Sequence, residues 1–276
     1  MGTAGTGADE VAGERRRREE ILSPGAWLMT VTSRICLDLL GSARVRRERY
    51  VGAWLPEPLP DHAEWGRTGD AGPNGPTGLA DPADQIVLDE SVTMAFLVVL
   101  ESMTPAERVA FVLHEVFRYP YAEIAGVLGR TPGACKQLAA SARRRVGAAR
   151  APVAAPGQAE VVRHVKEAWE TKDIGALVGL LDPAAVMTAD GGGMVGTVLR
   201  PVEGDARIAQ YMAAIADKAP GLELLERSVN GVPGLVARRA GVVLTVASFD
   251  VFERRVTRIW VVRNPEKLRP WVRDSP

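Results

Sequence analysis

The segment from Tyr121 to Val146, YAEIAGVLGRTPGACKQLAASARRRV, constrains the fold of this chain more than any other stretch. Its first half has a short helical pattern that ends at Gly129, where a residue without a Cβ can leave a helix at positive φ. Thr131 then supplies an N-cap, and Pro132 suits the first position of a second helix because its missing N–H costs nothing there. Two short helices joined by such a turn form a helix-turn-helix, whose second helix enters the major groove of DNA. The alternative is an αα-hairpin inside a core.

Charge favours the DNA-binding interpretation. The formal net charge of the 276 residues is zero, so any DNA binding must come from a local basic surface. The range from Arg130 to Arg150 contains basic residues and no acidic ones, as expected for a helix that lies against phosphates. The candidates for DNA contacts at the start of the second helix are Thr131, Gly133, Lys136 and Gln137. Of these, Lys136 and Gln137 are expected to contact base edges. The candidates for phosphate contacts are Arg130, Arg143, Arg144 and Arg145.

The first fifty residues contain one further helical pattern. Residues 1–22 combine small residues with a charged run that lacks an apolar face, which predicts a disordered leader. A helix then begins at Ser23-Pro24, and apolar residues at helical spacing, among them Ile35 and Leu39, are expected to face a core. Its basic C-terminal end includes Arg46 and Arg47. We interpret this end either as an ordinary solvated face or as a second DNA contact.

Residues 51–80 have the composition of a linker. At its start, Trp54, Leu55, Pro56, Glu57 and Pro58 form the sequence WLPEP, whose alternating prolines favour an extended segment. Such a segment is either a docking ligand for another domain or the stiff entrance to a linker. The residues that follow are rich in Gly, Pro, Asp, Asn and Thr, as in a flexible connection.

Two domains are expected after this linker. Residues 81–149 predict four helices, one capped by Thr104 with Glu107 in a capping box and buried along a stripe that includes Phe117. Residues 150–157 are a second linker. Residues 158–276 begin with three helical patterns and a short strand at 186–189, and then alternate with a period of two, as antiparallel strands do. This order predicts an α+β domain.

Composition excludes several classes of protein. No stretch is long and apolar enough to span a membrane, and the start has no signal-peptide core, so we expect a cytoplasmic protein. Cys36 and Cys135 lie far apart in apolar helical patterns, which indicates buried thiols. The three histidines have no ligand spacing. We therefore expect no disulfide, no metal site and no cofactor.

Five segments together resemble a known family. Residues 24–49, from PGAWL onward, resemble the last helix of a σ2 domain, and residues 81–146 resemble a σ4 domain. The sequences WLPEP, DGGG and NPEKL, in this order, resemble three motifs of one subgroup. The chain is thus similar, over about residues 23–270, to extracytoplasmic-function (ECF) RNA polymerase sigma factors with a C-terminal SnoaL-like domain. The residues of the second and third motifs are Asp190, Gly191, Gly192, Gly193, Asn264, Pro265, Lys267 and Leu268.

The resemblance implies a fold and a function. The fold is an all-α DNA-binding part, made of a partial σ2 remnant (23–50) and a four-helix σ4 domain, followed by an α+β SnoaL-like domain of the ketosteroid-isomerase type. The implied function is to direct RNA polymerase to promoters, with the helix-turn-helix recognising the −35 element. The SnoaL-like domain would dock on WLPEP through DGGG and NPEKL and modulate this activity. Promoter DNA and core RNA polymerase are the implied partners, and no obligate anti-sigma partner is implied.

The chain departs from the family pattern in one respect. Several σ2 helices precede PGAWL in the family, whereas here only about twenty residues do, so docking on RNA polymerase is expected to be weakened. One alternative is therefore a truncated DNA-binding regulator that does not initiate transcription. Another is a SnoaL-like isomerase or cyclase fused to a helix-turn-helix, with Asp190 or Asp250 as its base. Asp190 precedes three glycines, where an aspartate more commonly turns the chain, and we predict no catalytic residue.

Overall fold

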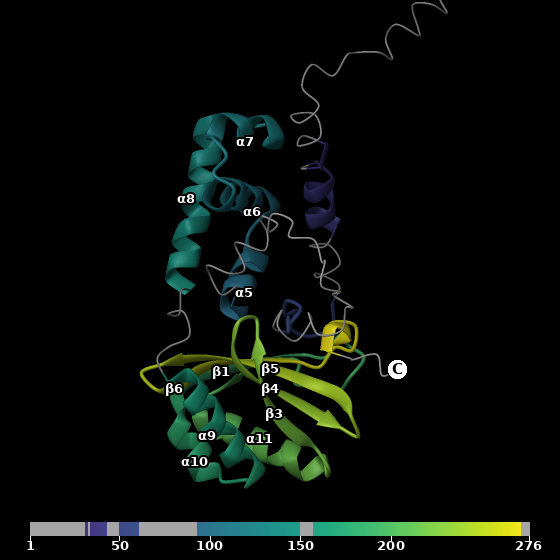
Figure 1. The fold of residues 1–276 in the computed structure, drawn as a ribbon. Helices are drawn as coiled ribbons and strands as arrows, with labels where there is room; N and C mark the ends of the chain where they lie inside the picture. The colour runs from purple at the N-terminus through teal and green to yellow at the C-terminus, as the bar shows by residue number, and fades with distance from the viewer. Residues whose placement is uncertain (1–30, 33, 43–49, 61–92, 150–156, 272–276) are drawn as a thin grey trace, which may run out of the picture.

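The computed structural model describes residues 31–32, 34–42, 50–60, 93–149 and 157–271 (Figure 1). These ranges form a helix at 34–42, an extended linker segment from Tyr50 to Pro60, a helical unit at 93–149 and a C-terminal domain at 157–271. The predicted leader and the predicted DNA contacts Arg46 and Arg47 lie outside the described residues. In the part of the chain that is described, no helix is long and apolar enough to cross a membrane.

The helical unit has the predicted helix-turn-helix. Its elements are α5 (Met94–Ser102), α6 (Pro105–Phe111), the π-helical η1 (Val112–Val116), α7 (Tyr121–Leu128) and α8 (Pro132–Ala149). Gly129 ends α7 with φ +62°, and the Thr131 hydroxyl accepts a hydrogen bond from the Ala134 amide at 3.2 Å, as predicted. The capping box of Thr104 and Glu107 is also confirmed.

The predicted stripe on the second of these helices is wrong at its end. Phe117 is 44% exposed, whereas Ala110 and Phe111 are buried. The cause is the π-helical stretch Val112–Val116, which inserts extra backbone into each turn and rotates the following residues out of the α-helical register. A pattern counted at 3.6 residues per turn cannot follow that rotation.

The C-terminal domain is a six-stranded sheet with three helices. The helices are α9 (Gln158–Glu170), α10 (Ile174–Leu180) and α11 (Asp205–Lys218), and a 3₁₀ turn, η2 (Arg269–Trp271), ends the described chain. The strands are β1 (Leu181–Asp190), β2 (Val202–Glu203), β3 (Glu223–Val229), β4 (Val232–Arg239), β5 (Val242–Phe252) and β6 (Arg255–Val262). Their order in the sheet is β2-β1-β6-β5-β4-β3. The α+β class and the antiparallel meander from β3 to β6 are confirmed.

The sheet pairing places two of the sequence motifs side by side. β1 runs parallel to β6, and Asp190 at the end of β1 lies opposite Val262 at the end of β6. Because parallel neighbours finish at the same edge of a sheet, the residues that follow both strands meet there. The backbone oxygen of Asp190 accepts hydrogen bonds from the amides of Arg263 and Asn264 at 2.7 and 3.1 Å. This pairing was not predicted, and it brings DGGG next to NPEKL.

The two faces of the sheet have different partners. Helices α9, α10 and α11 cover one face, and their side chains form a core with strand residues such as Phe249 and Ile259. On the other face, Leu55 of the linker segment and Met94 of α5 share a second core with Val246 and Trp260. The helical unit and the linker segment therefore pack on the side of the sheet opposite the three helices (Figure 1).

The predicted core face of the first helix is wrong. Ile35 and Leu39 are 53% and 58% exposed, and Cys36 is exposed, since no described residue covers this face. Cys135 is buried as predicted, and burial raises the pKa of its thiol.

Met94 provides a test of the contact between the helical unit and the sheet. Its side chain is 1% exposed, whereas Met194 is 56% exposed. We expect Met94→Ala to lower the free energy of unfolding by about 2–5 kcal/mol, because it removes buried apolar area and leaves a cavity. Met194→Ala, the same substitution at an exposed site, should change it by no more than about 0.5 kcal/mol. Chemical denaturation of both variants measures the difference, and equal effects would contradict the packing described.

Candidate nucleic-acid interface and interdomain anchor

Helix α8 has one buried and one exposed face. Cys135, Ala139 and Ala142 are fully buried against the rest of the helical unit. The candidates for DNA contacts that lie on the opposite side are all exposed: Arg130, Thr131, Gly133, Lys136, Gln137 and Arg144. Among them, positions 133, 137 and 144 share one helical face. Among the described residues, these three positions are exposed to solvent.

Two of the predicted phosphate contacts are already engaged within the helical unit. Arg143 forms an ion pair with Glu115. A guanidinium nitrogen of Arg145 lies 3.5 Å from a carboxylate oxygen of Glu107 and donates to the Ser102 backbone oxygen at 3.4 Å. For Arg144 no ion pair with another described residue is found. The three adjacent arginines are therefore not equivalent.

Glu107 holds α6 against α8. Its carboxylate accepts hydrogen bonds from Thr104, which caps α6, and from the Ser141 hydroxyl of α8 at 3.0 Å. Burial alone raises the pKa of Glu107, but these hydrogen bonds and the Arg145 charge outweigh it, so its pKa lies below the usual range. An ionised carboxylate at this position fixes the angle between the two helices.

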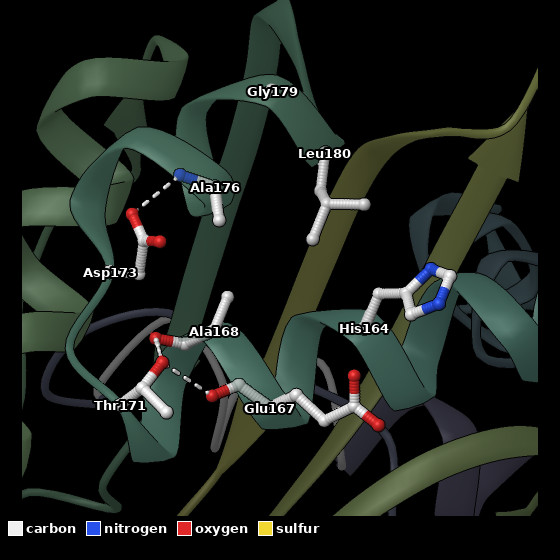
Figure 2. Close-up of a pocket in the computed structure, with 8 residues that line it drawn as sticks. All are labelled: His164, Glu167, Ala168, Thr171, Asp173, Ala176, Gly179 and Leu180. Carbon is white, nitrogen blue, oxygen red and sulfur yellow. Dashed lines mark hydrogen bonds between the residues drawn. The ribbon is translucent and has the colours of Figure 1, made fainter.

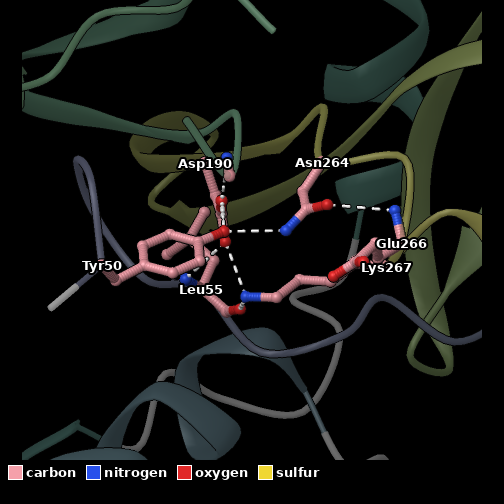
Figure 3. A network of polar contacts seen from close by, with 7 residues as sticks. Tyr50, Leu55, Asp190, Asn264, Glu266 and Lys267 are labelled. Atoms are coloured by element: carbon pink, nitrogen blue, oxygen red, sulfur yellow. Dashed lines mark hydrogen bonds and ion pairs between the residues drawn. The ribbon is translucent and has the colours of Figure 1, made fainter. Parts of the chain in front are cut away.

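A buried carboxylate joins the linker segment to the C-terminal domain (Figure 3). Asp190 is 1% exposed, and each of its oxygens accepts two hydrogen bonds. One oxygen accepts from the Tyr50 hydroxyl at 2.5 Å and the Gly192 amide at 3.0 Å. The other accepts from the Leu55 amide at 3.0 Å and the Lys267 ammonium at 2.7 Å. Asp190 thus turns the chain, as an aspartate before glycines does, and also holds the linker segment.

Lys267 contacts both sides of the junction. Besides its ion pair with Asp190, its ammonium group donates to the Leu55 backbone oxygen at 2.5 Å. It also lies 3.3 Å from the centroid of the Trp54 ring, which is a cation–π contact. The N–H of Leu55 therefore donates to Asp190, and its C=O accepts from Lys267. Both backbone groups are satisfied, as they are in a residue of a paired β-strand. We call Tyr50, Leu55, Asp190, Asn264 and Lys267 the first anchor.

Asn264 and the glycines complete the first anchor. Asn264 donates to the Tyr50 hydroxyl at 2.8 Å and accepts from the Glu266 amide at 3.0 Å. A Cβ on Gly192, which has φ +67°, would lie 2.6 Å from the Asn264 amide nitrogen, so this position requires glycine. Burial, and then the neighbouring Asp190 carboxylate, raise the pKa of the Tyr50 phenol, which therefore stays protonated and able to donate.

The remaining motif residues divide into buried and exposed ones. Pro56, Pro58 and Leu268 are buried, whereas Glu57 and Pro265 are exposed. A side chain on Gly191 would meet Thr197 at 2.8 Å, and one on Gly193 would meet Val51 at 3.1 Å. The structure thus brings together all three motifs, although not every residue within them makes a contact.

Sequence reasoning missed two residues that also contact the linker segment. The Trp271 indole donates to the Pro58 backbone oxygen at 2.7 Å. Asn230, in the turn between β3 and β4, exchanges hydrogen bonds with Leu59. The only signal for Asn230 was the Asn-Gly pair between two alternating segments, which predicts a hairpin turn but not a docking site. Trp271 carried no signal.

The two carboxylates that the isomerase alternative requires, Asp190 and Asp250, lie in different surroundings. Asp190 is fully engaged in the first anchor. Burial raises the pKa of Asp250, the charge of Arg258 partly lowers it again, and the two residues lie opposite each other in the register of β5 and β6. A groove of about 460 Å³ lies between α9 and α10 (Figure 2). Neither Asp190 nor Asp250 lines this groove. Its lining residues are His164, Glu167, Ala168, Thr171, Asp173, Ala176, Gly179 and Leu180. The described residues contain no group of three metal-ligating side chains.

A helix-turn-helix with an exposed second helix, followed in the chain by an α+β domain, is typical of a multidomain DNA-binding protein. Comparisons with known proteins narrow this class. Residues 93–146 match the family model described as Sigma-70, region 4. The chain is 35% identical over 264 residues to the ECF RNA polymerase sigma factor SigJ of Mycobacterium tuberculosis, covering 90% of this chain and 79% of that protein. It is also 35% identical over 246 residues to the probable ECF RNA polymerase sigma factor SigI of the same species, covering 88% and 78%.

A solved structure agrees with these sequence matches. The crystal structure of Mycobacterium tuberculosis SigJ matches with a TM-score of 0.64 and 31% identity, and the match covers 94% of this chain and 88% of that one. The chain belongs to the family of ECF RNA polymerase sigma factors. The helical unit is followed by the α+β C-terminal domain, and the match to the SigJ structure over 94% of the chain includes both parts.

A substitution of Lys267 tests how much the first anchor contributes to the free energy of unfolding. Its side chain is 9% exposed and that of Asp190 is 0% exposed. Lys267→Met should lower the free energy of unfolding by about 3–5 kcal/mol, because it leaves a buried carboxylate without its counter-charge. The control is Lys172→Met, which breaks an ion pair with Asp217 whose side chains are 49% and 64% exposed. That variant should lose no more than about 1 kcal/mol. Denaturation curves measure both, and a small effect at Lys267 would contradict the assigned role of the pair.

Proposed function

We propose that this chain is a promoter-recognition factor of RNA polymerase whose C-terminal domain controls transcription by holding the linker segment. Such a factor acts in the cytoplasm, where the polymerase is. The observation that carries the proposal is the first anchor, in which one buried carboxylate accepts hydrogen bonds from Tyr50 and Leu55 of the linker segment. The family assignment supplies the activity, and the anchor supplies the means of regulating it.

The anchor acts on both parts of the DNA-binding machinery. Tyr50 follows the last described residue of the first helix, residue 42, by eight positions, so the anchor holds the chain at that distance in sequence from the helix. On the same sheet face, Met94 and Ala95 fix the start of the helical unit. Both segments are thus attached to one rigid domain, although residues 61–92 separate them in sequence. The positions of the two segments then depend on their contacts with the C-terminal domain.

DNA recognition itself is assigned to the exposed face of α8. Lys136 and Gln137 are the residues proposed to contact bases, since they lie near the N-terminal end of the recognition helix. Arg130 and Arg144 are proposed to contact phosphates, which set orientation and affinity without specifying sequence. The residues of the first anchor are distinct from those of this face, so substitutions can test regulation and base recognition one at a time.

Arg144 tests the phosphate contact. Arg144→Ala should weaken binding to a duplex of random sequence and reduce the slope of log affinity against log salt by about one, since one phosphate contact is lost. Arg254→Ala serves as the control, because Arg254 is exposed and pairs with Glu160 in the C-terminal domain. Fluorescence anisotropy over a range of salt concentrations measures both slopes. An unchanged slope for Arg144→Ala would remove this residue from the interface.

Trp54 and Asp190 test the regulatory role. We expect Trp54→Ala and Asp190→Ala each to change output from a responsive promoter by at least about fivefold, the size of a typical coupling between sites. The matched controls are Phe252→Ala, an exposed aromatic residue, and Asp182→Ala, at the opposite end of the same strand as Asp190. Reporter transcription measures the output. Wild-type output for both test variants would refute the proposal.

Binding to core RNA polymerase separates this proposal from the non-initiating alternative. The full chain should be retained by immobilised core enzyme, and variants of Asp190 and Lys267 should be retained as well, because both residues are buried inside the factor. Retention of DNA but not of polymerase would instead identify a DNA-binding regulator that occupies promoters without initiating.

A further inference from the structure

The turn between β3 and β4 contacts the linker segment beyond the WLPEP motif. The Asn230 amide donates to the Leu59 backbone oxygen at 2.8 Å, and the Leu59 amide donates to the Asn230 side-chain oxygen at 3.3 Å. Pro60 and Val229 form an antiparallel bridge beside this pair. The linker segment is thus paired for a short distance with the end of the edge strand β3.

A second contact holds the preceding residue. The Trp271 indole, which is 9% exposed, donates to the Pro58 oxygen at 2.7 Å. Proline has no N–H, so its backbone can be fixed only through its carbonyl oxygen or by packing. Pro58 is buried and uses both. Three consecutive linker residues, from Pro58 to Pro60, are therefore held by contacts that involve no charged group.

The identity of residue 230 supports a role beyond the turn. Asn230 has φ +54° and is followed by Gly231 with φ +76°, a conformation that glycine adopts more easily than asparagine. Asn230 is also 6% exposed, and its amide nitrogen has no hydrogen-bond partner among the described residues. A glycine would serve the turn without burying an unpaired donor. Asparagine is common at this turn position, and here its side-chain oxygen also accepts a hydrogen bond from the Leu59 amide.

These contacts lie next to the residues on which the helical unit packs. Val229 and Trp271 belong to the same apolar cluster as Met94 and Ala95 of α5. The first anchor, by contrast, lies where β1 and β6 end and holds residues 50–55. The linker segment is therefore fixed at two places, one by an ion pair and one by neutral hydrogen bonds next to α5.

We propose that Asn230 and Trp271 are positioning residues that form a second anchor, which fixes Pro58–Pro60 independently of the Asp190–Lys267 pair and tunes transcription output. This inference rests on the proposed function, since it assigns further residues to the same regulated linker segment. The second anchor sets where the chain leaves the C-terminal domain toward the helical unit. When the second anchor is lost, Pro58–Pro60 are released from the C-terminal domain, while the first anchor still holds Leu55.

Two backbone amides report the two anchors separately. The Leu55 amide donates to Asp190 and reports the first anchor, whereas the Leu59 amide donates to Asn230 and reports the second. Hydrogen exchange of both amides is measured by NMR in the full chain. Trp271→Phe keeps an aromatic ring but removes the donor to Pro58, and it does not touch the Leu59 hydrogen bond. We expect it to speed exchange at Leu59 about tenfold and at Leu55 by less than about twofold.

Asn230→Gly gives an independent test, because glycine preserves the turn and removes only the side-chain acceptor. It should also speed exchange at Leu59 and not at Leu55. Each variant has a matched control within the C-terminal domain. Trp169 is 8% exposed and donates to the Met212 oxygen at 2.7 Å, so Trp169→Phe removes an equivalent bond elsewhere. Ala240 has φ +49° before Gly241 in the β4–β5 turn, so Ala240→Gly alters an equivalent turn position. Neither control should change exchange at Leu59.

Transcription distinguishes the second anchor from the proposed function. The double variant Asn230→Gly/Trp271→Phe should change reporter output by at least about fivefold, and Trp169→Phe should not. Unchanged exchange at Leu59 would overturn the second anchor. Faster exchange with wild-type output would overturn its role in regulation, and Asp190→Ala, measured beside it, then shows whether the proposed function also fails. If Asp190→Ala changes output and the double variant does not, only the further inference is lost.

Discussion

The arrangement of this protein depends on the burial of one carboxylate. Asp190 is almost completely removed from water, so its charge must be paired and its lone pairs must be satisfied inside the protein. Lys267 supplies the charge, and Tyr50, Leu55 and Gly192 supply the remaining donors. These donors come from three segments that are distant in sequence. Because an unpaired charge at this depth would be costly, all three segments must be in place together, and the linker segment becomes part of the domain that it contacts.

The sheet transmits this constraint to the DNA-binding part of the molecule. One of its faces is occupied by α9, α10 and α11, so only the other face is available for the linker segment and α5. Leu55 and Met94 bury themselves in the same cluster on that face. A change at the linker segment is therefore also a change in the packing of α5, which belongs to the helical unit. Coupling between the anchor and DNA recognition has a contiguous physical route, and the exchange and transcription measurements decide whether it is used.

Local rules predicted the local parts of this structure well. Gly129, Thr131 and the Thr104–Glu107 capping box follow from backbone and capping preferences, and the structure has each of them. The meander followed from the period of two. The parallel pairing of β1 with β6 did not follow, because it depends on contacts between residues some seventy positions apart. Phe117 was misplaced because a π-helical stretch has no recognisable sequence pattern here. Alternating prolines already marked WLPEP as a possible docking ligand, whereas an interdomain role for DGGG and NPEKL came only from the resemblance. Contacts outside the motifs, such as that of Trp271, had no such guide.

The basic run on α8 shows a further limit of counting charges along a sequence. Three consecutive arginines suggested three phosphate contacts, but Glu107 and Glu115, from α6 and η1, engage Arg145 and Arg143. An arginine that is already paired gains less from a phosphate, since it must exchange one charge-assisted hydrogen bond for another. Arg144 has no such partner among the described residues, so a phosphate contact there would replace no existing ion pair. The same two acids also hold α6 and η1 against the recognition helix. Two arginines of the run that was expected to bind DNA therefore pair with acids of α6 and η1, which pack beside the recognition helix.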